Sequence, residues 1–357
     1  MITESQYLPI VAFGFAFLIT YISIPSIVKV ARMKHLFDEP DERTVHTESI
    51  PTLGGIAIFA GLAISSLIFT NHLSEIRYIV AATIALFFVG LKDDILVIAP
   101  LTKLLGQIFA ASFLVVFTDI QFTNLHGLLG IEHIPVYLGI PLTVFTIIVI
   151  TNSFNLIDGI DGLAPSLGIT TAGAFGIWFY LSGNYEYTIL AASLIGGLLA
   201  FMRFNLFSKE NKIFMGDTGS LILGFIISIL VIKFNELNIV PDFKYAVYGS
   251  PTLSFAILMI PLYDTMRVMF LRFFQGKPIF FPDKQHLHHL FLKLGFSHIQ
   301  TDLILVVINS AFIIAAFYFH NSAGLHMLAL SYFLAAMIIF TIPDMILRKR
   351  TKTQSPK

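Results

Sequence analysis

The sequence predicts an all-α integral membrane protein with about eleven transmembrane helices, and its composition is the first reason. Of its 357 residues, 56% are hydrophobic and only 12% are charged, whereas soluble domains carry about 25% charged residues. The mean hydropathy is +0.82, and so few polar residues could not cover so much apolar surface in water. A soluble enzyme and a disordered chain are therefore excluded, and the absence of cysteine excludes a disulfide scaffold. The formal net charge of +0 gives no support for nucleic-acid binding.

Eleven long runs without a charged residue follow one another along the chain, and each is expected to form one membrane-spanning helix. Their hydrophobicity is continuous and does not alternate, which favours helices over strands. The first run is too long for a cleaved signal peptide and lacks a basic segment before it, so a retained span is expected. Several runs are shorter than the roughly 20 residues that a span needs, so flanking residues must extend them. The runs are residues 8–28, 53–70, 78–91, 104–118, 136–154, 166–182, 187–202, 218–232, 245–263, 303–319 and 326–343.

The distribution of lysine and arginine predicts the orientation in the membrane. Nineteen of the 22 basic residues fall on one side of the expected spans, and only Arg77, Lys233 and Lys244 fall on the other. By the positive-inside rule the basic side is cytoplasmic, which places the N-terminus outside and the C-terminus inside. Residues 1–357 are predicted to form a single polytopic domain. Its active site is expected on the cytoplasmic segments, about residues 29–52, 92–103, 152–166, 203–220 and 264–302.

The polar clusters lie at this one interface and avoid the middles of the apolar runs. An ion-coupled transporter is expected to carry ionisable residues near mid-span, so the pattern favours an enzyme with one cytosolic and one membrane-embedded substrate. The sequence also lacks the glycine-rich and serine motifs typical of NAD binding, ATP hydrolysis and serine hydrolysis.

The first cluster is the pair Asp93 and Asp94, followed ten residues later by Lys103. Adjacent carboxylates at a membrane surface can bind Mg²⁺ or accept a proton, and a solvated turn is the alternative. The second cluster places Asn152, Asn155, Asp158 and Asp161 three residues apart. On a straight helix this spacing drifts by about 60° per step, so the four cannot share one face.

The glycines that follow Asp158 and Asp161 indicate that the helix ends there and a loop begins. Oxygen-bearing side chains at this position suit Mg²⁺ or the ring donors of a nucleobase or sugar, and helix capping is the alternative. The third cluster, the sequence FMGDTGS around Asp217, opens the run that follows it. Capping explains its polar residues, whereas its two glycines suggest that something approaches the backbone closely. Free N–H groups at such a helix start also favour phosphate.

The fourth cluster, DKQHLHH, contains His286, His288 and His289 and lies downstream of Arg272. The usual spacing of zinc ligands is absent, so phosphate binding and proton transfer fit better, with a wetted loop as the alternative. The fifth cluster combines His46 with the sequence PTLGG at residues 51–55. A glycine pair at the start of a span more often indicates close helix packing than chemistry.

Taken together and in this order, these motifs resemble the polyprenyl-phosphate N-acetylhexosamine-1-phosphate transferases, the WecA/TagO/MraY family. The resemblance rests on PTLGG, KDD with its downstream lysine, NSFNLIDGIDGLA, FMGDTGS and DKQHLHH. It implies that a bacterial cytoplasmic (inner) membrane enzyme transfers an N-acetylhexosamine 1-phosphate from a UDP-sugar, most simply UDP-GlcNAc, to undecaprenyl phosphate. UMP is released, and the product starts lipid-linked cell-envelope glycan synthesis.

The same resemblance implies roles for individual residues. It implies Mg²⁺, with Mn²⁺ as a substitute, held by Asn155 and Asp217. Asp93 and Asp94 would engage the lipid phosphate, and Lys103 would lie near the diphosphate. The residues implied to bind the nucleotide, sugar and diphosphate are Asp158, Asp161, His46, Arg272, His286, His288 and His289.

The histidine motif is more similar to the WecA/TagO branch than to the MraY branch, which resembles P-x-H-H-H at this position. An MraY-like phospho-MurNAc-pentapeptide transferase is the alternative within the family. A nucleotide-sugar or lipid transporter and a hydrolase of UDP-sugars are the alternatives from other classes. The segment 205–217 departs from the family pattern, which puts a base-contacting role for Asn205 in doubt. A homodimer is one oligomeric state that the sequence leaves open.

Overall fold

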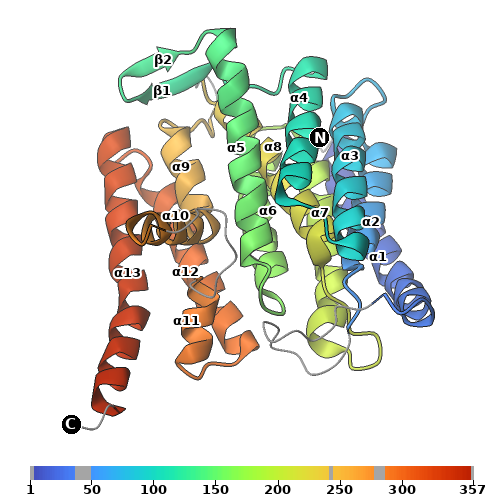
Figure 1. Cartoon of the computed structure of the whole chain (residues 1–357). Helices are drawn as coiled ribbons and strands as arrows, with labels where there is room; N and C mark the ends of the chain where they lie inside the picture. The colour runs from blue at the N-terminus through green and yellow to red at the C-terminus, as the bar shows by residue number, and fades with distance from the viewer. Residues whose placement is uncertain (1–3, 37–49, 241–243, 277–285, 355–357) are drawn as a thin grey trace.

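The computed structural model describes residues 4–36, 50–240, 244–276 and 286–354, and this part of the chain is almost entirely helical (Figure 1). One short 3₁₀ helix, Glu4–Gln6, precedes the first α-helix. The helices are α1 (Leu8–Met33), α2 (Gly54–Phe69), α3 (Ile76–Leu96), α4 (Pro100–Phe117), α5 (Val136–Ile157), α6 (Leu163–Leu181), α7 (Tyr185–Phe207), α8 (Gly216–Leu237), α9 (Ser250–Ile257), α10 (Met259–Phe274), α11 (Leu287–Lys293), α12 (His298–Phe319) and α13 (Leu325–Gln354). The strands β1 (Asn124–Leu128) and β2 (Ile131–His133) form an antiparallel hairpin.

The helices confirm a multi-span helical membrane protein. Within the described residues, seven helices are individually long and apolar enough to cross a bilayer, and a bent pair of helices would make eight. Each of the other predicted apolar runs also falls on a helix, but α2 has only 16 residues and α3 carries charged residues at its end. The described helices therefore support the class, while the count of about eleven spans stays a prediction.

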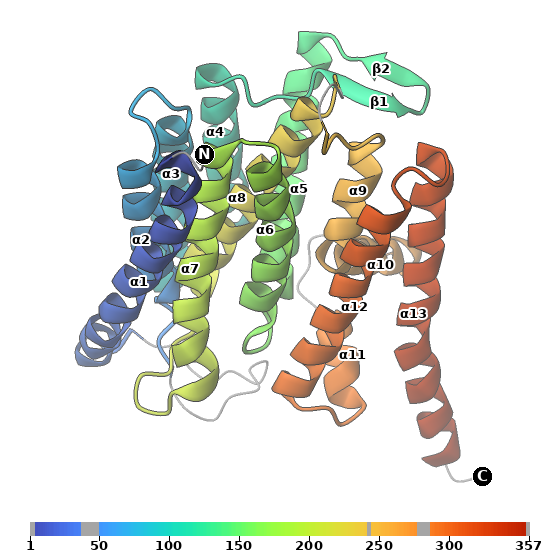
Figure 2. The same cartoon turned by 180° about the vertical axis from the view of Figure 1, so that it is seen from behind.

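The ninth apolar run differs from the straight span that was expected. It is divided at Leu258 into α9 and α10, whose axes are bent by 81°. Both views show α10 lying across the direction of the neighbouring helices (Figures 1 and 2). Periodicity and hydropathy do not reveal such a break, because the apolar character continues through it.

Helix α8 forms the centre of the bundle. It packs against α2, α3, α5 and α6, and most of its side chains are buried. Helices α1 and α7 pack closely along one another beside it. Helices α9 to α13 form a second group that meets the first through α5, α6 and the end of α8 (Figure 2). A helix that is apolar all round belongs in such a buried position.

The two ends of the bundle carry different features. The hairpin and the N-terminus lie at one end, and α11 and the C-terminus lie at the other (Figure 1). We call these the hairpin end and the α11 end. Helices α3 and α5 finish, and α8 begins, on the side of the α11 end, so the polar motifs at these three helix termini are brought close together.

Candidate active site

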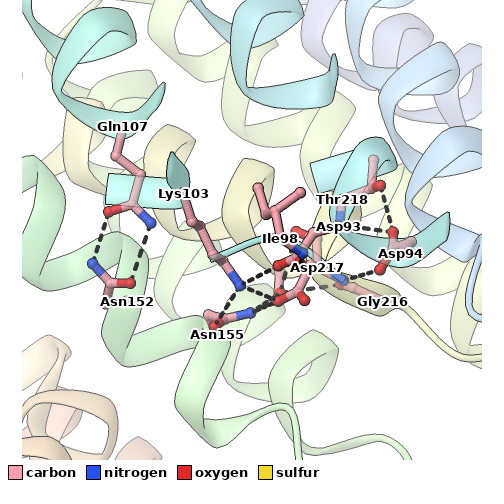
Figure 3. A network of polar contacts seen from close by, with 11 residues as sticks. Asp93, Asp94, Ile98, Lys103, Gln107, Asn152, Asn155, Gly216, Asp217 and Thr218 are labelled. Carbon is pink, nitrogen blue, oxygen red and sulfur yellow. Dashed lines mark hydrogen bonds and ion pairs between the residues drawn. The ribbon is translucent and has the colours of Figure 1, made fainter. Parts of the chain in front are cut away.

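A charged centre forms where four helices meet, and it consists of Asp93, Lys103, Asn155 and Asp217 (Figure 3). The ammonium of Lys103 on α4 lies 3.2 Å from Oδ2 of Asp93 on α3 and 3.2 Å from Oδ1 of Asn155 on α5. It also pairs with Oδ1 of Asp217 on α8. Asn155 Nδ2 donates to that same oxygen and, at 2.8 Å, to Oγ of Ser220. The structure thus brings together four residues from motifs that are far apart in the sequence.

The members of the charged centre are not equally accessible. The side chain of Asp217 keeps 31% of its surface exposed, compared with 16% for Lys103 and 9% for Asp93. Asp217 is therefore the carboxylate that an incoming ligand or cation can reach most easily.

Asp94 faces away from the charged centre and caps α8. Its carboxylate accepts the backbone N–H groups of Asp217 at 2.6 Å and Thr218 at 3.0 Å, and the Thr218 hydroxyl at 2.5 Å (Figure 3). An anion at a helix N-terminus is stabilised by these N–H groups and by the helix dipole. The N–H groups at the start of α8, which the sequence suggested as a phosphate site, therefore already donate to the carboxylate of Asp94. This geometry favours a positioning role for Asp94 over direct contact with a substrate.

The close backbone approach suggested by the glycines of FMGDTGS is made by the protein itself. Gly216 has a positive φ of 70°, and a Cβ there would collide with the carboxylate of Asp94 and with the carbonyl of Thr52. Gly54 N donates to Phe214 O at 2.9 Å, so the PTLGG segment runs against the start of FMGDTGS. A Cβ on Gly55 would strike the backbone of Gly219. The expectation of close helix packing at this glycine pair is confirmed.

The donor set of the charged centre suits Mg²⁺. Among the described residues, no group of three His, Asp or Glu side chains converges as a metal site. However, the carboxylates of Asp93 and Asp217 and the amide oxygen of Asn155 already surround a cation, the ammonium of Lys103. Mg²⁺ commonly uses one or two carboxylates and completes its shell with water and substrate phosphates. Oxygen ligands of this kind, next to an accessible carboxylate, therefore fit the ion that the sequence predicted.

The turn between α5 and α6, residues 158–162, borders the charged centre. Helix α5 ends at Ile157, as the glycines predicted, and Asp158 follows it directly. Burial raises the pKa of Asp158 to about 8, and the nearby charges of Asp217 and Asp94 add to this effect. Asp158 is therefore largely protonated near neutral pH unless a cation binds close to it.

Asp161, at the other end of this turn, is held by basic groups. Its Oδ2 lies 2.9 Å from Nζ of Lys212, in the loop between α7 and α8, and 3.5 Å from Nδ1 of His298, at the start of α12. Gly162 N donates to Oδ1 of Asn205 at 2.9 Å, and Asn205 Nδ2 donates to Ile213 O at 3.0 Å. Both ends of the buried Asn205 amide are thus used within the protein, so Asn205 fixes this turn to the α7–α8 loop.

Asn152 lies one turn along α5 from the charged centre. Its side chain exchanges two hydrogen bonds, of 2.8 and 3.2 Å, with the side chain of Gln107 on α4 (Figure 3). Gln107 belongs to none of the sequence motifs, although its position one helical turn after Lys103 on the same helix was a usable signal.

His288 and His289 lie on α11, and His286 directly precedes it, where it is anchored by a buried residue that no sequence motif includes. His286 Nδ1 lies 2.9 Å from Oδ2 of Asp264, which is buried on α10. His288 is also buried, and both of its ring nitrogens lack a hydrogen-bond partner within the described part of the chain. Burial, and then the charge of His289, lowers the pKa of His288 to about 3. A Cβ on Gly159 would collide with Nε2 of His288, so the cluster reaches the α5–α6 turn.

Two further predicted residues lie apart from these clusters in the sequence. Arg272 is buried near the end of α10, with 4% of its surface exposed. His46 lies outside the described residues, and so does the beginning of the DKQHLHH motif.

The fold and site together define a polytopic membrane protein with an oxygen-rich centre around a lysine ammonium at one end of its helical bundle. Comparison with known proteins identifies its family. The sequence model described as "Glycosyl transferase family 4" matches residues 76–235, which include the whole charged centre. A relative in Bacillus subtilis (strain 168), named "Probable undecaprenyl-phosphate N-acetylglucosaminyl 1-phosphate transferase", is 31% identical over 325 residues, covering 88% of this chain and 86% of the relative.

Two enterobacterial relatives agree with this result, and both are named "Undecaprenyl-phosphate alpha-N-acetylglucosaminyl 1-phosphate transferase". The Yersinia pestis protein is 30% identical and the Escherichia coli (strain K12) protein is 29% identical, each over 282 residues, or 78% of this chain and 75% of the relative. The chain therefore belongs to glycosyl transferase family 4, and the resemblance that the motifs indicated is confirmed.

Proposed function

We propose that the protein transfers N-acetylglucosamine 1-phosphate from UDP-N-acetylglucosamine to undecaprenyl phosphate and releases UMP. The names of its relatives support this donor and this acceptor. The observation that carries the proposal is the charged centre itself: two carboxylates, an amide and a lysine drawn from four helices at the α11 end of a membrane-spanning bundle. Such a centre is suited to a reaction between two phosphate-bearing substrates.

We also propose an orientation and a cellular location. The chain would cross the cytoplasmic (inner) membrane about eleven times, with the N-terminus outside and the charged centre facing the cytoplasm. The strong bias of basic residues toward one side supports this orientation. The positions of the two termini at opposite ends of the bundle agree with an odd number of spans (Figure 1). The site would then be open to a cytosolic sugar nucleotide and, from the side, to a lipid of the inner leaflet.

The obstacle to the reaction is the repulsion between two polyanions. Asp217 and Asn155 would hold Mg²⁺, with Asp93 beside them, and the bound ion would offset negative charge on the diphosphate of the donor. Lys103 carries a further positive charge at the same place and would favour the departure of UMP. Asp94 would keep Asp217 in position by holding the first turn of α8.

We favour direct attack by the lipid phosphate. An oxygen of undecaprenyl phosphate would attack the β-phosphorus of the donor, and the bond from that phosphorus to the bridging oxygen would break, leaving UMP. A phosphate monoester with a second pKa near ~6 is already mostly dianionic at neutral pH, so it needs little help from a base. Asp93 is poorly suited as a nucleophile, because one oxygen accepts Ile98 N at 2.7 Å and the other pairs with Lys103.

The remaining predicted residues would bind the donor. We assign the nucleotide to Asp158 and Asp161 on the α5–α6 turn, where the donor would lie next to the charged centre. The sugar and diphosphate would lie against the histidine cluster. The other residues proposed for the donor are His46, Arg272, His286, His288 and His289.

One assay tests the proposal. Purified protein is incubated with Mg²⁺ and labelled UDP-N-acetylglucosamine, with and without undecaprenyl phosphate, and UMP and lipid-bound label are both measured. Equal amounts of the two products, formed only with the lipid acceptor, are expected. UMP release without the acceptor would instead indicate a hydrolase, and movement of label into sealed vesicles without UMP release would indicate a transporter. Preference for UDP-MurNAc-pentapeptide in the same assay would indicate an MraY-like enzyme.

A further inference from the structure

One buried side chain, on α12, bonds to both sides of the break between α9 and α10. A break in an apolar bundle leaves backbone N–H and C=O groups without their usual helical partners. Asn309 on α12, with 0% of its surface exposed, bonds to both sides of the break. Its Oδ1 accepts Ile260 N at 3.3 Å from α10, and its Nδ2 donates to Ile257 O at 3.2 Å from α9. Asn309 thus supplies both kinds of partner that the 81° bend requires.

After the bend, Asp264 on α10 bonds to the start of α11. Asp264 lies less than two turns after the break and is 2% exposed. Its Oδ2 lies 2.9 Å from His286 Nδ1, and its Oδ1 accepts the backbone N–H of Leu287 at 2.9 Å. Each oxygen of this carboxylate therefore holds a different group at the start of α11.

The pairing sets which nitrogen of His286 is available. Where the Asp264 carboxylate accepts this hydrogen bond, Nδ1 of His286 is the donor and carries the proton. Nε2 is then the ring nitrogen left for a ligand. A histidine whose tautomer and ring orientation are both set by a second residue presents a defined group to a substrate.

Helix α11 also contacts the α5–α6 turn, which borders the charged centre. His288, two residues after His286, fills the space beside Gly159 on the α5–α6 turn. That turn follows directly from the segment of α5 that carries Asn155. A displacement of α11 would therefore change both the histidine cluster and the wall of the site next to the charged centre.

Resting on the proposed function, we propose that Asp264 is a positioning residue for the transfer reaction. It orients His286 and the start of α11. Asn309 holds α10 in the direction that brings Asp264 to His286. This assigns a role to two buried polar residues that the sequence motifs do not include. The competing interpretation is that both residues only stabilise the fold.

Two measurements separate these interpretations. The first is hydrogen–deuterium exchange of the full-length protein in detergent, followed in peptides that cover residues 286–296. The second is kcat/KM of transfer for Asp264→Asn, His286→Ala and the double variant. Asp264→Asn keeps the shape of the side chain but offers only one acceptor. It can hold both groups only by donating to Nδ1 of His286, which removes the charge of the carboxylate and reverses the tautomer of the ring.

A matched control is available at the hairpin end. Asn238 is also a buried asparagine that bridges backbone groups: it donates to Phe234 O and accepts from Val247 N, both at 2.7 Å. Asn238→Leu removes two buried hydrogen bonds, as Asn309→Leu does, but far from α11. Comparing these two variants separates a loss of stability from a loss of position.

The proposal predicts faster exchange in the 286–296 peptides, by about 10-fold or more, for Asp264→Asn and Asn309→Leu but not for Asn238→Leu. Asp264→Asn and His286→Ala should each lower kcat/KM by about 10- to 100-fold, and the double variant should be no more than about 3-fold worse than His286→Ala. Asn238→Leu should stay within about 3-fold of the wild type.

Unchanged exchange around α11 in Asp264→Asn would overturn the proposal, and so would fully multiplicative losses in the double variant. The exchange measurement does not depend on which substrate the protein uses. A wild type that forms no lipid-linked product would therefore refute the proposed function, while the exchange results would still decide whether Asp264 and Asn309 hold α11.

Discussion

The adjacent residues Asp93 and Asp94 provide the sharpest prediction, because the structure gives two identical side chains different tasks. Asp93 pairs with Lys103 in the charged centre, whereas both oxygens of Asp94 are bound to the first turn of α8. Replacing each by asparagine changes the same atoms and removes the same charge. We expect Asp93→Asn to abolish transfer and Asp94→Asn mainly to reduce stability.

The magnitudes follow from the contacts. Asparagine caps a helix about as well as aspartate, but one of the three hydrogen bonds to Asp94 would be lost, and a bond to a charged group contributes roughly 1.5–3 kcal/mol. Asp94→Asn should therefore lower the free energy of unfolding by about 2 kcal/mol and keep kcat/KM within about 10-fold of the wild type. Asp93→Asn should lower kcat by about 100-fold or more, because it removes a negative charge that holds Lys103 and lies beside the proposed Mg²⁺ site.

The assay compares three quantities for both variants. Thermal unfolding in detergent reports stability, calorimetry reports binding of UDP-N-acetylglucosamine, and the lipid-label assay reports transfer. Both variants should bind the donor, and only Asp94→Asn should turn it over efficiently. An Asp94→Asn protein that is folded and binds the donor, yet has lost as much transfer as Asp93→Asn, would refute the positioning role.

Three further predictions concern other parts of the site. Asp217→Ala should leave the protein folded in membranes yet abolish Mg²⁺-dependent transfer; normal turnover would contradict the metal assignment. Gly159→Ala should lower kcat/KM by about 10-fold or more by displacing His288, whereas Gly173→Ala, where no atom lies within 4 Å of the added Cβ, should behave like the wild type. Burial lowers the pKa of His288 in the folded protein to about 3, so between that pH and pH ~6.5 only the unfolded chain binds a proton there. This histidine therefore makes the free energy of unfolding fall as the pH drops. From pH 7 to pH 5 the free energy of unfolding should therefore fall by about 2 kcal/mol less in His288→Gln than in the wild type, measured by thermal unfolding. An equal fall in both proteins would contradict this.

The class of fold was predictable because it depends on quantities that are visible along the chain. Apolar runs long enough to span a bilayer must become helices, and ten of the eleven predicted runs coincide with single helices. The ninth run was mistaken for one straight span, because its bend depends on Asn309, a residue 49 positions away in sequence from its partner Ile260. A tertiary contact of this kind leaves no mark on local hydropathy.

The site was predictable where a motif carries its own chemistry. Asp93, Lys103, Asn155 and Asp217 were all identified from their sequence context, and the structure brings them together. The sequence did not predict that Asp93 would pair with Lys103 while Asp94 caps α8. These different contacts depend on the direction in which each carboxylate points from the end of α3.

Other residues escaped notice because their roles depend on contacts that form only in the folded chain. Asp264 lies just past the ninth apolar run and meets His286 only after the chain has turned, and Gln107, one helical turn after Lys103, shows its role only through its contact with Asn152. Asn205 shows the opposite case: it stands near a family motif, but both ends of its amide are used to hold the backbone.

In the proposed reaction the sugar moves together with its phosphate from a soluble donor to a lipid acceptor. Its most direct test uses UDP-N-acetylglucosamine labelled at the β-phosphorus, incubated with the purified protein, Mg²⁺ and undecaprenyl phosphate. The labelled phosphorus should appear in the lipid phase in the same amount as UMP appears in the aqueous phase. Labelled phosphorus that stays in the aqueous phase as UDP, while the sugar enters the lipid, would contradict the account.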